Sequence, residues 1–354
     1  MRVVICWIGA SGYMTACYRK LAMMSGIELK IILAPSQGAA VAPFGKELTD
    51  GLPVVVLDQA MVNDAAGVAR IVVDFKPDIV SIPGWSVAAF NQLPMHAELV
   101  NAKFVMAIDT PWKGTWRQKL AKYKFGKLFS RISRIMVPGE RGFQLARCLG
   151  FHDSQIRRGV YGVDTDQFSL CLAERMSGPW PKRFLFTGRY TSVKGVDVLM
   201  SAYAKYRGMV NEPWDLVCSG KGEMGSLLAG QAGVEDRGFV QPVDQPKLWG
   251  QCGVFVLPSR YDPWPLVITE AASAGLPVIC TEDCGSAVEL IRPFYNGLTI
   301  PSDDIPALAD AMCWMHEHES ELPEMGKRSM EFAGAYSAQV WAIRWLEMFR
   351  EMRK

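Results

Sequence analysis

The sequence has 354 residues, and its 38 lysines and arginines against 36 aspartates and glutamates give a net charge of only +2. So balanced a charge says little about partners, and no apolar run approaches the roughly 18 residues that a membrane span needs. Nine cysteines without paired spacing favour a reducing cytoplasm over the disulfide framework of a secreted protein.

Apolar runs that predict β-strands alternate with helical segments along the chain. The runs are continuous, so we expect strands that are covered on both faces, as in parallel sheets. A first series comprises Val3–Ile8, Leu29–Leu33, Val54–Leu57, Ile79–Ile82, Phe104–Ile108 and Ile135–Val137. A second series comprises Phe184–Phe186, Leu216–Cys218, Val254–Leu257 and Val278–Cys280.

Two domains of ordinary size fit this length. The best linker candidate is Leu170–Arg183, which contains the run Ser177-Gly178-Pro179-Trp180-Pro181. We therefore predict an α/β protein whose two Rossmann-like domains, residues 1–170 and 183–335, face each other across a cleft. In the last segment, residues 336–354, large apolar residues recur at the spacing of a helix with one core-facing side.

A glycine turn, Gly9-Ala10-Ser11-Gly12, follows the first strand. It lacks the spacing of a nicotinamide fingerprint, and no acid ends the second strand. Two interpretations stay open for Gly12: a turn that faces a donor substrate across the cleft, or a plain strand-to-helix turn.

Residues 113–147 carry ten basic side chains, with Glu140 as the only acid among them. The basic residues are Lys113, Arg117, Lys119, Lys122, Lys124, Lys127, Arg131, Arg134, Arg141 and Arg147. A solvated helix face is the common explanation. The alternative is a surface for anionic lipid or a lipid-diphosphate acceptor. Nucleic acid is a poorer candidate, because no nucleic-acid motif accompanies the run.

A strand, a loop and a helix meet near the middle of the second half. The strand Val254–Leu257 leads into a loop with Asp262, and a helix from about Leu266 to Ala274 carries Glu270. Such a junction directs free N–H groups and the positive end of the helix dipole at anything over the strand's carboxyl end. A phosphate fits there, with carboxylates nearby to hold hydroxyls, which predicts a phosphorylated sugar compound.

The segment Asp262-x7-Glu270-Ala271-Ala272-Ser273-Ala274-Gly275-Leu276-Pro277-Val278 resembles the signature of the retaining family 4 glycosyltransferases, Glu-x7-Glu-Ala-x-Ala-x-Gly-x-Pro-Val. The resemblance covers nearly the whole second half, through Gly188-Arg189, Lys194-Gly195, Ser219-Gly220-Lys221-Gly222, Gly238-Phe239-Val240, Cys284-Gly285-Ser286, Glu289 and Asn296-Gly297. It implies the GT-B fold, whose final helix crosses back onto the N-terminal domain.

The same resemblance assigns roles to charged residues. Arg189 and Lys194 would contact the nucleotide diphosphate, whose negative charge grows as the glycosidic bond breaks, so no metal or other cofactor is expected. Glu270 would hold the ribose hydroxyls and Asp262 the donor sugar. Two residues depart from the pattern: aspartate at 262 is one methylene shorter than glutamate, and Pro265 replaces glycine and removes one N–H. Whether these changes alter the choice of donor sugar stays open.

Further residues would contact the donor through their backbone. The N–H groups of Leu266 and Val267 lie where the helix begins, and those of Gly285 and Ser286 would reach phosphate or sugar. Glycines let the backbone pass close to the nucleotide, and Val240 would lie near the base. The glycines are Gly188, Gly220 and Gly222.

Asp109 ends a predicted strand where many relatives carry a histidine beside the reacting sugar. In relatives that act on bacterial surface polysaccharides, an acidic residue followed by Trp, Gly and Gln resembles the run after Asp109 here. The interpretations are an orienting group for a donor or acceptor hydroxyl, a less favoured covalent nucleophile, and a polar loop turn.

The resemblance thus implies a retaining hexosyltransferase-like enzyme of bacterial polysaccharide biosynthesis. It would move a sugar from a nucleoside diphosphate to a hydroxyl, on a sugar, lipid-linked or polysaccharide precursor. We expect it in the cytoplasm, peripheral on the inner face of the membrane, with no metal site and no nucleic-acid partner. The alternatives are a nucleotide-sugar epimerase of the same fold and a non-catalytic relative that binds sugar nucleotides.

Overall fold

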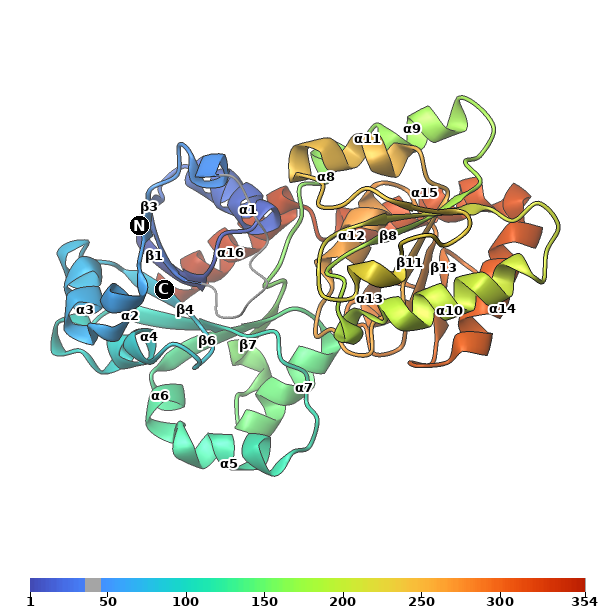
Figure 1. Ribbon diagram of the computed structural model, residues 1–354. Helices are drawn as coiled ribbons and strands as arrows, with labels where there is room; N and C mark the ends of the chain where they lie inside the picture. Colours follow the sequence, from blue (N-terminus) through green and yellow to red (C-terminus); the bar gives the residue numbers. More distant parts are fainter. Residues whose placement is uncertain (36–45, 354) are drawn as a thin grey trace. The chain divides into compact units, whose positions relative to one another are not determined.

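The computed structural model describes residues 1–35 and 46–353. Its contacts divide the chain into two compact units, Met1–Gly162 with Ala338–Lys354, and Val163–Ser337 (Figure 1). Each unit is built on a parallel sheet with helices packed against it, as the continuous apolar runs predicted. Among the described residues, no helix is both long and apolar enough to cross a membrane.

Within its described residues the first unit has a seven-stranded sheet in the order β3-β2-β1-β4-β5-β6-β7. The strands are β1 (Arg2–Ile8), β2 (Glu28–Ala34), β3 (Val54–Val56), β4 (Ile79–Pro83), β5 (Lys103–Ala107), β6 (Ile132–Val137) and β7 (Ile156–Arg158). The helices are α1 (Gly12–Ala22), α2 (Gln59–Asn63), α3 (Ala65–Asp74), α4 (Ala88–Gln92), α5 (Trp116–Lys124), α6 (Gly126–Ser130), α7 (Glu140–Leu149) and α16 (Ala338–Arg353).

The second unit has a six-stranded sheet in the order β10-β9-β8-β11-β12-β13. The strands are β8 (Arg183–Thr187), β9 (Asp215–Ser219), β10 (Val234–Asp236), β11 (Val254–Leu257), β12 (Val278–Thr281) and β13 (Gly297–Ile300). The helices are α8 (Thr165–Phe168), α9 (Cys171–Met176), α10 (Val196–Arg207), α11 (Gln245–Gly250), α12 (Leu266–Ser273), α13 (Ala287–Leu290), α14 (Ile305–Glu317) and α15 (Leu322–Gly334).

The first sheet separates two apolar clusters. One contains side chains of α1 and α16, and the other contains side chains of α3, α4, α6 and α7. The side chains of β1 alternate between them: Val3 and Ile5 belong to the first cluster, whereas Val4 and Cys6 belong to the second. This alternation explains why the strand's sequence is apolar at successive positions.

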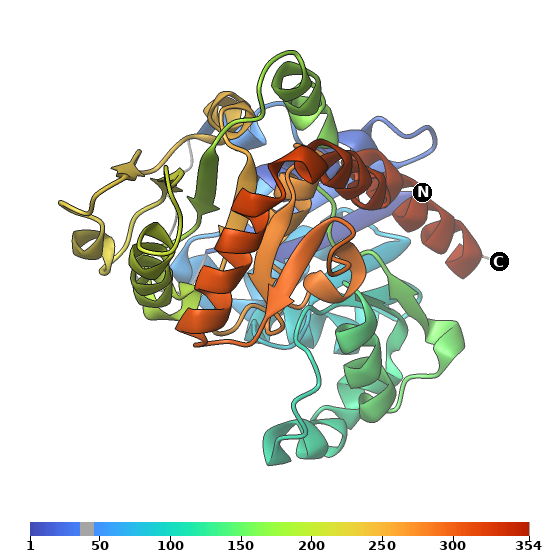
Figure 2. The same cartoon turned by 90° about the vertical axis from the view of Figure 1, so that its right-hand side faces the viewer.

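The last helix, α16, packs on α1 of the first unit, which confirms the prediction that it returns to the N-terminal domain. The rings of Tyr18 and Trp341 lie 6.1 Å apart, and the indole N–H groups of Trp341 and Trp345 donate to the carbonyls of Val160 and Gly159 at 2.9 and 3.1 Å. Figures 1 and 2 both show the two chain ends near one another in this unit.

The segment expected to link the domains has a different place in the structure. All of Leu170–Arg183 lies within the second unit, where it contains α9, and Leu172 and Trp180 are buried in the core. The division between the units instead falls between Gly162 and Val163. Glycine and proline in the run before β8 indicated a linker, but Trp180 anchors that run, and its indole N–H donates to Gly253 O at 3.1 Å.

Candidate active site

In the second sheet the direction in which the chain adds successive strands reverses between β8 and β11. Strands β9 and β10 follow on one side of β8, whereas β12 and β13 follow on the other side of β11. At such a point the loops leaving two neighbouring parallel strands diverge and leave a crevice at the carboxyl ends. Lys194 lies in the loop after β8, and Asp262 lies in the loop after β11.

The ammonium of Lys194 and the carboxylate of Asp262 form an ion pair at this point. Both side chains are largely buried, with 14% and 12% of their surface exposed. The second carboxylate oxygen of Asp262 accepts the backbone N–H of Trp264 at 3.2 Å, which fixes its orientation. Two residues that the sequence singled out from different loops therefore meet.

Local packing explains why the two loops approach so closely. Gly195 has φ +69, and a Cβ at this position would lie 2.0 Å from the carbonyl oxygen of Pro258. Arg260 donates to both carboxylate oxygens of Asp197, at 2.8 and 2.7 Å, and its backbone N–H donates to Val193 O at 2.9 Å. The hydrogen bond from Arg260 lowers the pKa of Asp197.

Sequence reasoning gave Arg260 no role. Its pairing with an acid in the first turn of α10 depends on two loops 63 positions apart meeting in space. The sequence held only two signals for this pairing. They are an arginine directly before Tyr261-Asp262 and an acid directly after Gly195-Val196.

Glu270 lies one turn into α12, the helix that begins just after Pro265. Leu266 and Val267 are its first two residues, so their N–H groups have no acceptor within the helix. The Glu270 side chain is half-buried, and no described residue gives it a hydrogen bond or ion pair. Burial alone raises the pKa of its carboxyl to about 7. A carboxylate kept at this cost without a protein partner is typical of a ligand-binding group.

The other end of α12 is held by a buried arginine that the sequence analysis missed. Arg175 of α9 donates to the carbonyls of Gly275 and Ala274 at 2.8 and 2.5 Å, just after the helix ends. Its guanidinium lies over the Trp180 ring at 5.2 Å, and burial lowers its pKa to about 10. A cation here complements the negative end of the helix dipole. No sequence signal was available, because the residue lies in the expected linker.

Glycines bring the loops after β8 and β9 into backbone contact. A Cβ on Gly220 would lie 1.8 Å from the carbonyl oxygen of Gly188, and one on Gly222 would lie 2.3 Å from that of Tyr190. The hydroxyl of Tyr190 donates to Asp236 at 2.7 Å, which ties this layer to the end of β10. The three glycines predicted to contact a nucleotide therefore lie together at the carboxyl ends of β8 and β9.

Gly285 and Ser286 form hydrogen bonds to the backbone of the loop that contains Asp262. The N–H of Gly285 donates to Asp262 O at 2.8 Å, and the hydroxyl of Ser286 donates to Pro265 O at 3.1 Å. The sequence analysis expected the N–H groups here to meet the donor. The N–H of Gly285 instead carries a hydrogen bond within the protein, and a direct contact with the donor stays a prediction.

The structure places the remaining predicted donor residues as follows. Arg189 is exposed in the loop after β8, and Val240 is half-buried in the loop after β10, against the core. Gly12 is the first residue of α1, directly after the β1 turn of the first unit. Contacts of these three residues with a nucleotide stay predictions.

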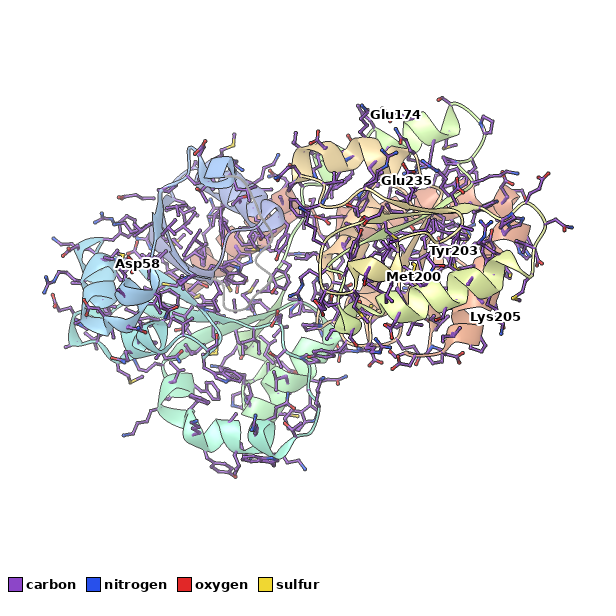
Figure 3. The ribbon with its side chains drawn as sticks, viewed as in Figure 1. Asp58, Glu174, Met200, Tyr203, Lys205 and Glu235 are labelled. Atoms are coloured by element: carbon purple, nitrogen blue, oxygen red, sulfur yellow. The ribbon has the colours of Figure 1, made fainter. Side chains whose placement is uncertain are left out.

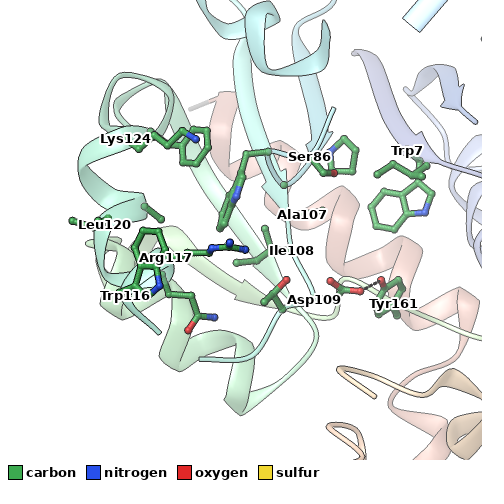
Figure 4. Close-up of a pocket in the computed structure, with 18 of the residues that line it drawn as sticks. Trp7, Ser86, Ala107, Ile108, Asp109, Trp116, Arg117, Leu120, Lys124 and Tyr161 are labelled. Atoms are coloured by element: carbon green, nitrogen blue, oxygen red, sulfur yellow. Dashed lines mark hydrogen bonds between the residues drawn. The ribbon is translucent and has the colours of Figure 1, made fainter. Parts of the chain in front are cut away.

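The first unit contains a pocket of about 990 Å³ where its own sheet changes direction, between β1 and β4 (Figure 4). Its walls are mostly aromatic and apolar, with a few polar groups. They include Trp7, Tyr13, Trp85, Ile108, Asp109, Trp116, Arg117, Gln118, Leu120, Lys124, Phe125 and Tyr161. A pocket of this size and composition is typical of a small-molecule site.

Asp109 lies in this pocket, after β5, and its carboxylate accepts the hydroxyl of Tyr161 at 2.8 Å (Figure 4). The ring of Tyr161 is held edge-on by Trp7 and Tyr13, with ring centres 6.0 and 6.2 Å away. The sequence analysis missed Tyr161, which follows a short strand that it also missed.

The basic residues between 113 and 147 divide into two groups. Some bind backbone or acids within the unit: Arg131 donates to Pro94 O and Val100 O, and Arg147 pairs with Asp153. The group on α5 is exposed instead, together with large apolar side chains. These exposed side chains of α5 are Trp116, Arg117, Lys119, Leu120, Lys122, Tyr123 and Lys124.

Residues 181–318 match the family of Glycosyl transferases group 1. An exopolysaccharide phosphotransferase of Streptomyces coelicolor is 28% identical over 180 residues, which are 48% of this chain and 19% of that protein. The D-rhamnosyltransferase WbpZ of Pseudomonas aeruginosa is 25% identical over 70% of this chain and 72% of its own. The N,N'-diacetylbacillosaminyl-diphospho-undecaprenol α-1,3-N-acetylgalactosaminyltransferase of Campylobacter jejuni is 27% identical over 77% and 74%. The chain thus spans about a fifth of the length of the Streptomyces protein.

The fold is also that of solved glycosyltransferase structures. Anabaena HepE with bound UDP superposes with a TM-score of 0.76 at 15% identity, over 99% of this chain and 100% of its own. A glycosyltransferase of Rickettsia africae gives the same TM-score at 18% identity. The GT-B fold predicted from the sequence is therefore confirmed. The matched segment, the relatives and the fold together support a family 4-like glycosyltransferase with the GT-B fold.

Proposed function

We propose that this protein transfers a sugar from a nucleoside diphosphate sugar to a hydroxyl acceptor, with retention of the anomeric configuration. The observation that carries the proposal is the arrangement at the edge of the second sheet. Lys194 and Asp262 meet where the sheet changes direction, and Glu270 offers a half-buried carboxylate to which no described residue gives a hydrogen bond or ion pair.

In this proposal the second unit binds the donor. The diphosphate gains negative charge as the bond to the sugar breaks, and Lys194 and Arg189 stabilise that charge without a metal ion or other cofactor. The free N–H groups of Leu266 and Val267 add the positive end of the α12 dipole. Glu270 accepts hydrogen bonds from the two ribose hydroxyls, and Asp262 holds a hydroxyl of the sugar.

Retention follows if the acceptor attacks the face that the diphosphate leaves. The departing phosphate oxygen then takes the acceptor's proton, so the site needs no separate base. Asp109 orients a sugar hydroxyl by accepting its hydrogen bond, while Tyr161 holds the carboxylate in place.

We assign the acceptor to the pocket of the first unit. Its aromatic walls suit the apolar faces of sugar rings, and Asp109 supplies an acceptor for hydroxyls. The Campylobacter relative is named for a diphospho-undecaprenol acceptor, and WbpZ for rhamnosyl transfer. Both names support a lipid-linked or polysaccharide precursor as the acceptor.

We further propose that α5 lies on the anionic inner face of the cytoplasmic membrane. Trp116, Leu120 and Tyr123 recur at the spacing of one helix face and are 67%, 51% and 73% exposed. Exposed lysines of the same helix would contact anionic headgroups. If co-sedimentation with vesicles showed no dependence on anionic lipid or salt, this part of the proposal would be wrong.

The test of the main proposal has two steps. Thermal-shift screening against nucleoside diphosphates and their sugars first identifies the base and the donor. Release of nucleotide from that donor is then followed with and without lipid-linked and free sugar acceptors. Release that depends on an acceptor, with an α-donor giving an α-product, supports retaining transfer. Tight donor binding without transfer to any acceptor would instead indicate a non-catalytic relative.

A further inference from the structure

We propose that Arg117 and Lys124 of α5 form a phosphate subsite at the pocket of the first unit, so that the acceptor carries a phosphate or diphosphate next to its reacting sugar. This inference rests on the proposed function, because it names the chemical class of that acceptor. It concerns two of the ten basic residues between 113 and 147, and it gives them a role apart from the others.

Both residues line the pocket, and they come from the same side of one helix. They are seven positions apart in the sequence, so about two helical turns, or roughly 10 Å along the axis, separate them. Figure 4 shows the Arg117 side chain reaching toward Ile108 and Asp109. The Lys124 ammonium lies over the ring of Phe125, 5.4 Å from the ring centre.

Neither cation has an acidic partner within the described part of the chain. Arg117 lies beside the Trp116 ring, with its guanidinium carbon 5.5 Å from the ring centre, and no described acidic residue forms an ion pair with it. Among the described residues that line the pocket, the one carboxylate is that of Asp109, which accepts the Tyr161 hydroxyl. Two unpaired cations beside an apolar cavity favour an anionic ligand over a neutral one.

The chemistry of the groups in the pocket fits one kind of molecule. Asp109 and Tyr161 offer hydrogen bonds for sugar hydroxyls, Arg117 and Lys124 offer charge for phosphate oxygens, and the exposed Leu120 continues the wall as an apolar surface. A sugar joined through a phosphate or diphosphate to an apolar chain presents the same three chemistries. A guanidinium is well suited to phosphate because two of its N–H groups fit two oxygens.

A membrane headgroup is the other source of phosphate, and the helix itself offers the control that separates the two. Lys119 and Lys122 are exposed on the same helix but do not line the pocket. Attraction to a membrane depends on the summed charge of the helix and treats all four cations alike. A subsite in the pocket depends on Arg117 and Lys124 only.

The experiment compares the double variant Arg117→Gln/Lys124→Gln with the matched double variant Lys119→Gln/Lys122→Gln, each in the full-length protein without membranes. The first measurement is the binding of octyl diphosphate by calorimetry. The second is the KM for a short-chain alkyl diphosphate-linked sugar, compared with the alkyl glycoside of the same sugar. We expect the pocket variant to weaken diphosphate binding and raise that KM about tenfold or more, since charge-assisted hydrogen bonds are lost. The pocket variant's KM for the glycoside should stay within about twofold of the wild-type value. The matched variant's diphosphate binding and both of its KM values should do the same.

Three results would overturn the inference. Equal losses in both double variants would indicate that summed helix charge, not the pocket, attracts the ligand. Equal losses toward the diphosphate-linked sugar and the glycoside would place the two cations outside a phosphate contact. Unchanged octyl diphosphate binding in the pocket variant overturns it even if no transfer is detected. Failure of the proposed function would give a different result. No sugar transfer would be detected, while the pocket variant would still bind octyl diphosphate more weakly than the matched variant.

Discussion

The ammonium of Lys194 and the carboxylate of Asp262 form an ion pair between the loops that follow two neighbouring strands of the second unit. Neither group is far from solvent, yet both are mostly covered, so each depends on the other for stability. The pair also orients the lysine before any ligand arrives. A preorganised cation needs little rearrangement when charge develops on a leaving group, which is the basis of electrostatic catalysis.

Replacing Lys194 with alanine should lower the turnover number by two or more orders of magnitude, because the departing diphosphate loses a fixed positive charge. The measurement is steady-state transfer with the donor identified by thermal shift. Lys205→Ala is the control: Lys205 is exposed on the neighbouring helix α10, whereas Tyr203 on that helix is buried (Figure 3). Turnover that is unchanged in Lys194→Ala would refute the leaving-group role.

Gly195→Ala should destabilise the second unit and reduce activity together. At Gly195 a methyl group meets two obstacles, the positive φ and the carbonyl oxygen of Pro258 at 2.0 Å. Gly230 is a matched control, since its φ is +72 and nothing lies within 4 Å of a Cβ there. We expect Gly230→Ala to cost about 1 kcal/mol of unfolding free energy and Gly195→Ala clearly more, measured by urea unfolding. Equal costs would show that the close approach of the two loops contributes nothing.

Parallel sheets with both faces covered could be predicted, because strands that are apolar at successive positions fit few other arrangements. The strands that were missed, β7, β10 and β13, lie toward the edges of the sheets and are short. β7 and β10 contain charged residues, as Ile156-Arg157-Arg158 and Val234-Glu235-Asp236 show. Edge strands need less apolar sequence, because one side or face of the strand meets solvent.

The candidate site could be predicted where a local motif marks it, as at Lys194, Asp262 and Glu270. The residues that hold these groups in place were not predictable. Arg260 and Arg175 act through contacts 63 and about 100 positions away in the chain, and no local pattern encodes such distances. The pocket of the first unit could not be predicted for the same reason, because its walls come from many separate segments.

Tyr161→Phe should weaken acceptor use while leaving donor binding unchanged. The substitution removes the hydroxyl that donates to Asp109 at 2.8 Å but keeps the ring between Trp7 and Tyr13. An Asp109 carboxylate that has lost one hydrogen bond is less well oriented, so we expect the acceptor KM to rise about three- to tenfold. Asp109→Asn should raise it further. If both variants keep the wild-type acceptor KM, the carboxylate does not contact the acceptor.

The pKa of Glu270 gives the protein a pH dependence whose sign can be worked out. Its carboxyl titrates near pH 7 in the folded chain and near 4.5 when exposed. Between these values the folded state binds the proton and the unfolded state does not, so this group's contribution to stability is lost as pH rises from 4.5 toward 7. Glu270→Gln removes the titration. We therefore expect the variant to be more stable than the wild type above pH 7, and equally stable at the acid end of the window.

Nucleotide binding should show the opposite trend with pH. Only the ionised Glu270 carboxylate can accept both ribose hydroxyls, so the wild-type affinity for the nucleoside diphosphate should rise as pH increases from about 5.5 to 8. In Glu270→Gln the affinity should be about tenfold or more weaker above pH 7, because the amide presents one acceptor oxygen. The nucleotide's own phosphate titrates identically against both proteins, so the difference between the two curves isolates the side chain. Calorimetric titrations in two buffers of different ionisation enthalpy measure it directly: the wild type should release protons on binding near pH 6.5, in excess of the variant. Parallel curves for the two proteins would show that Glu270 does not contact the ribose.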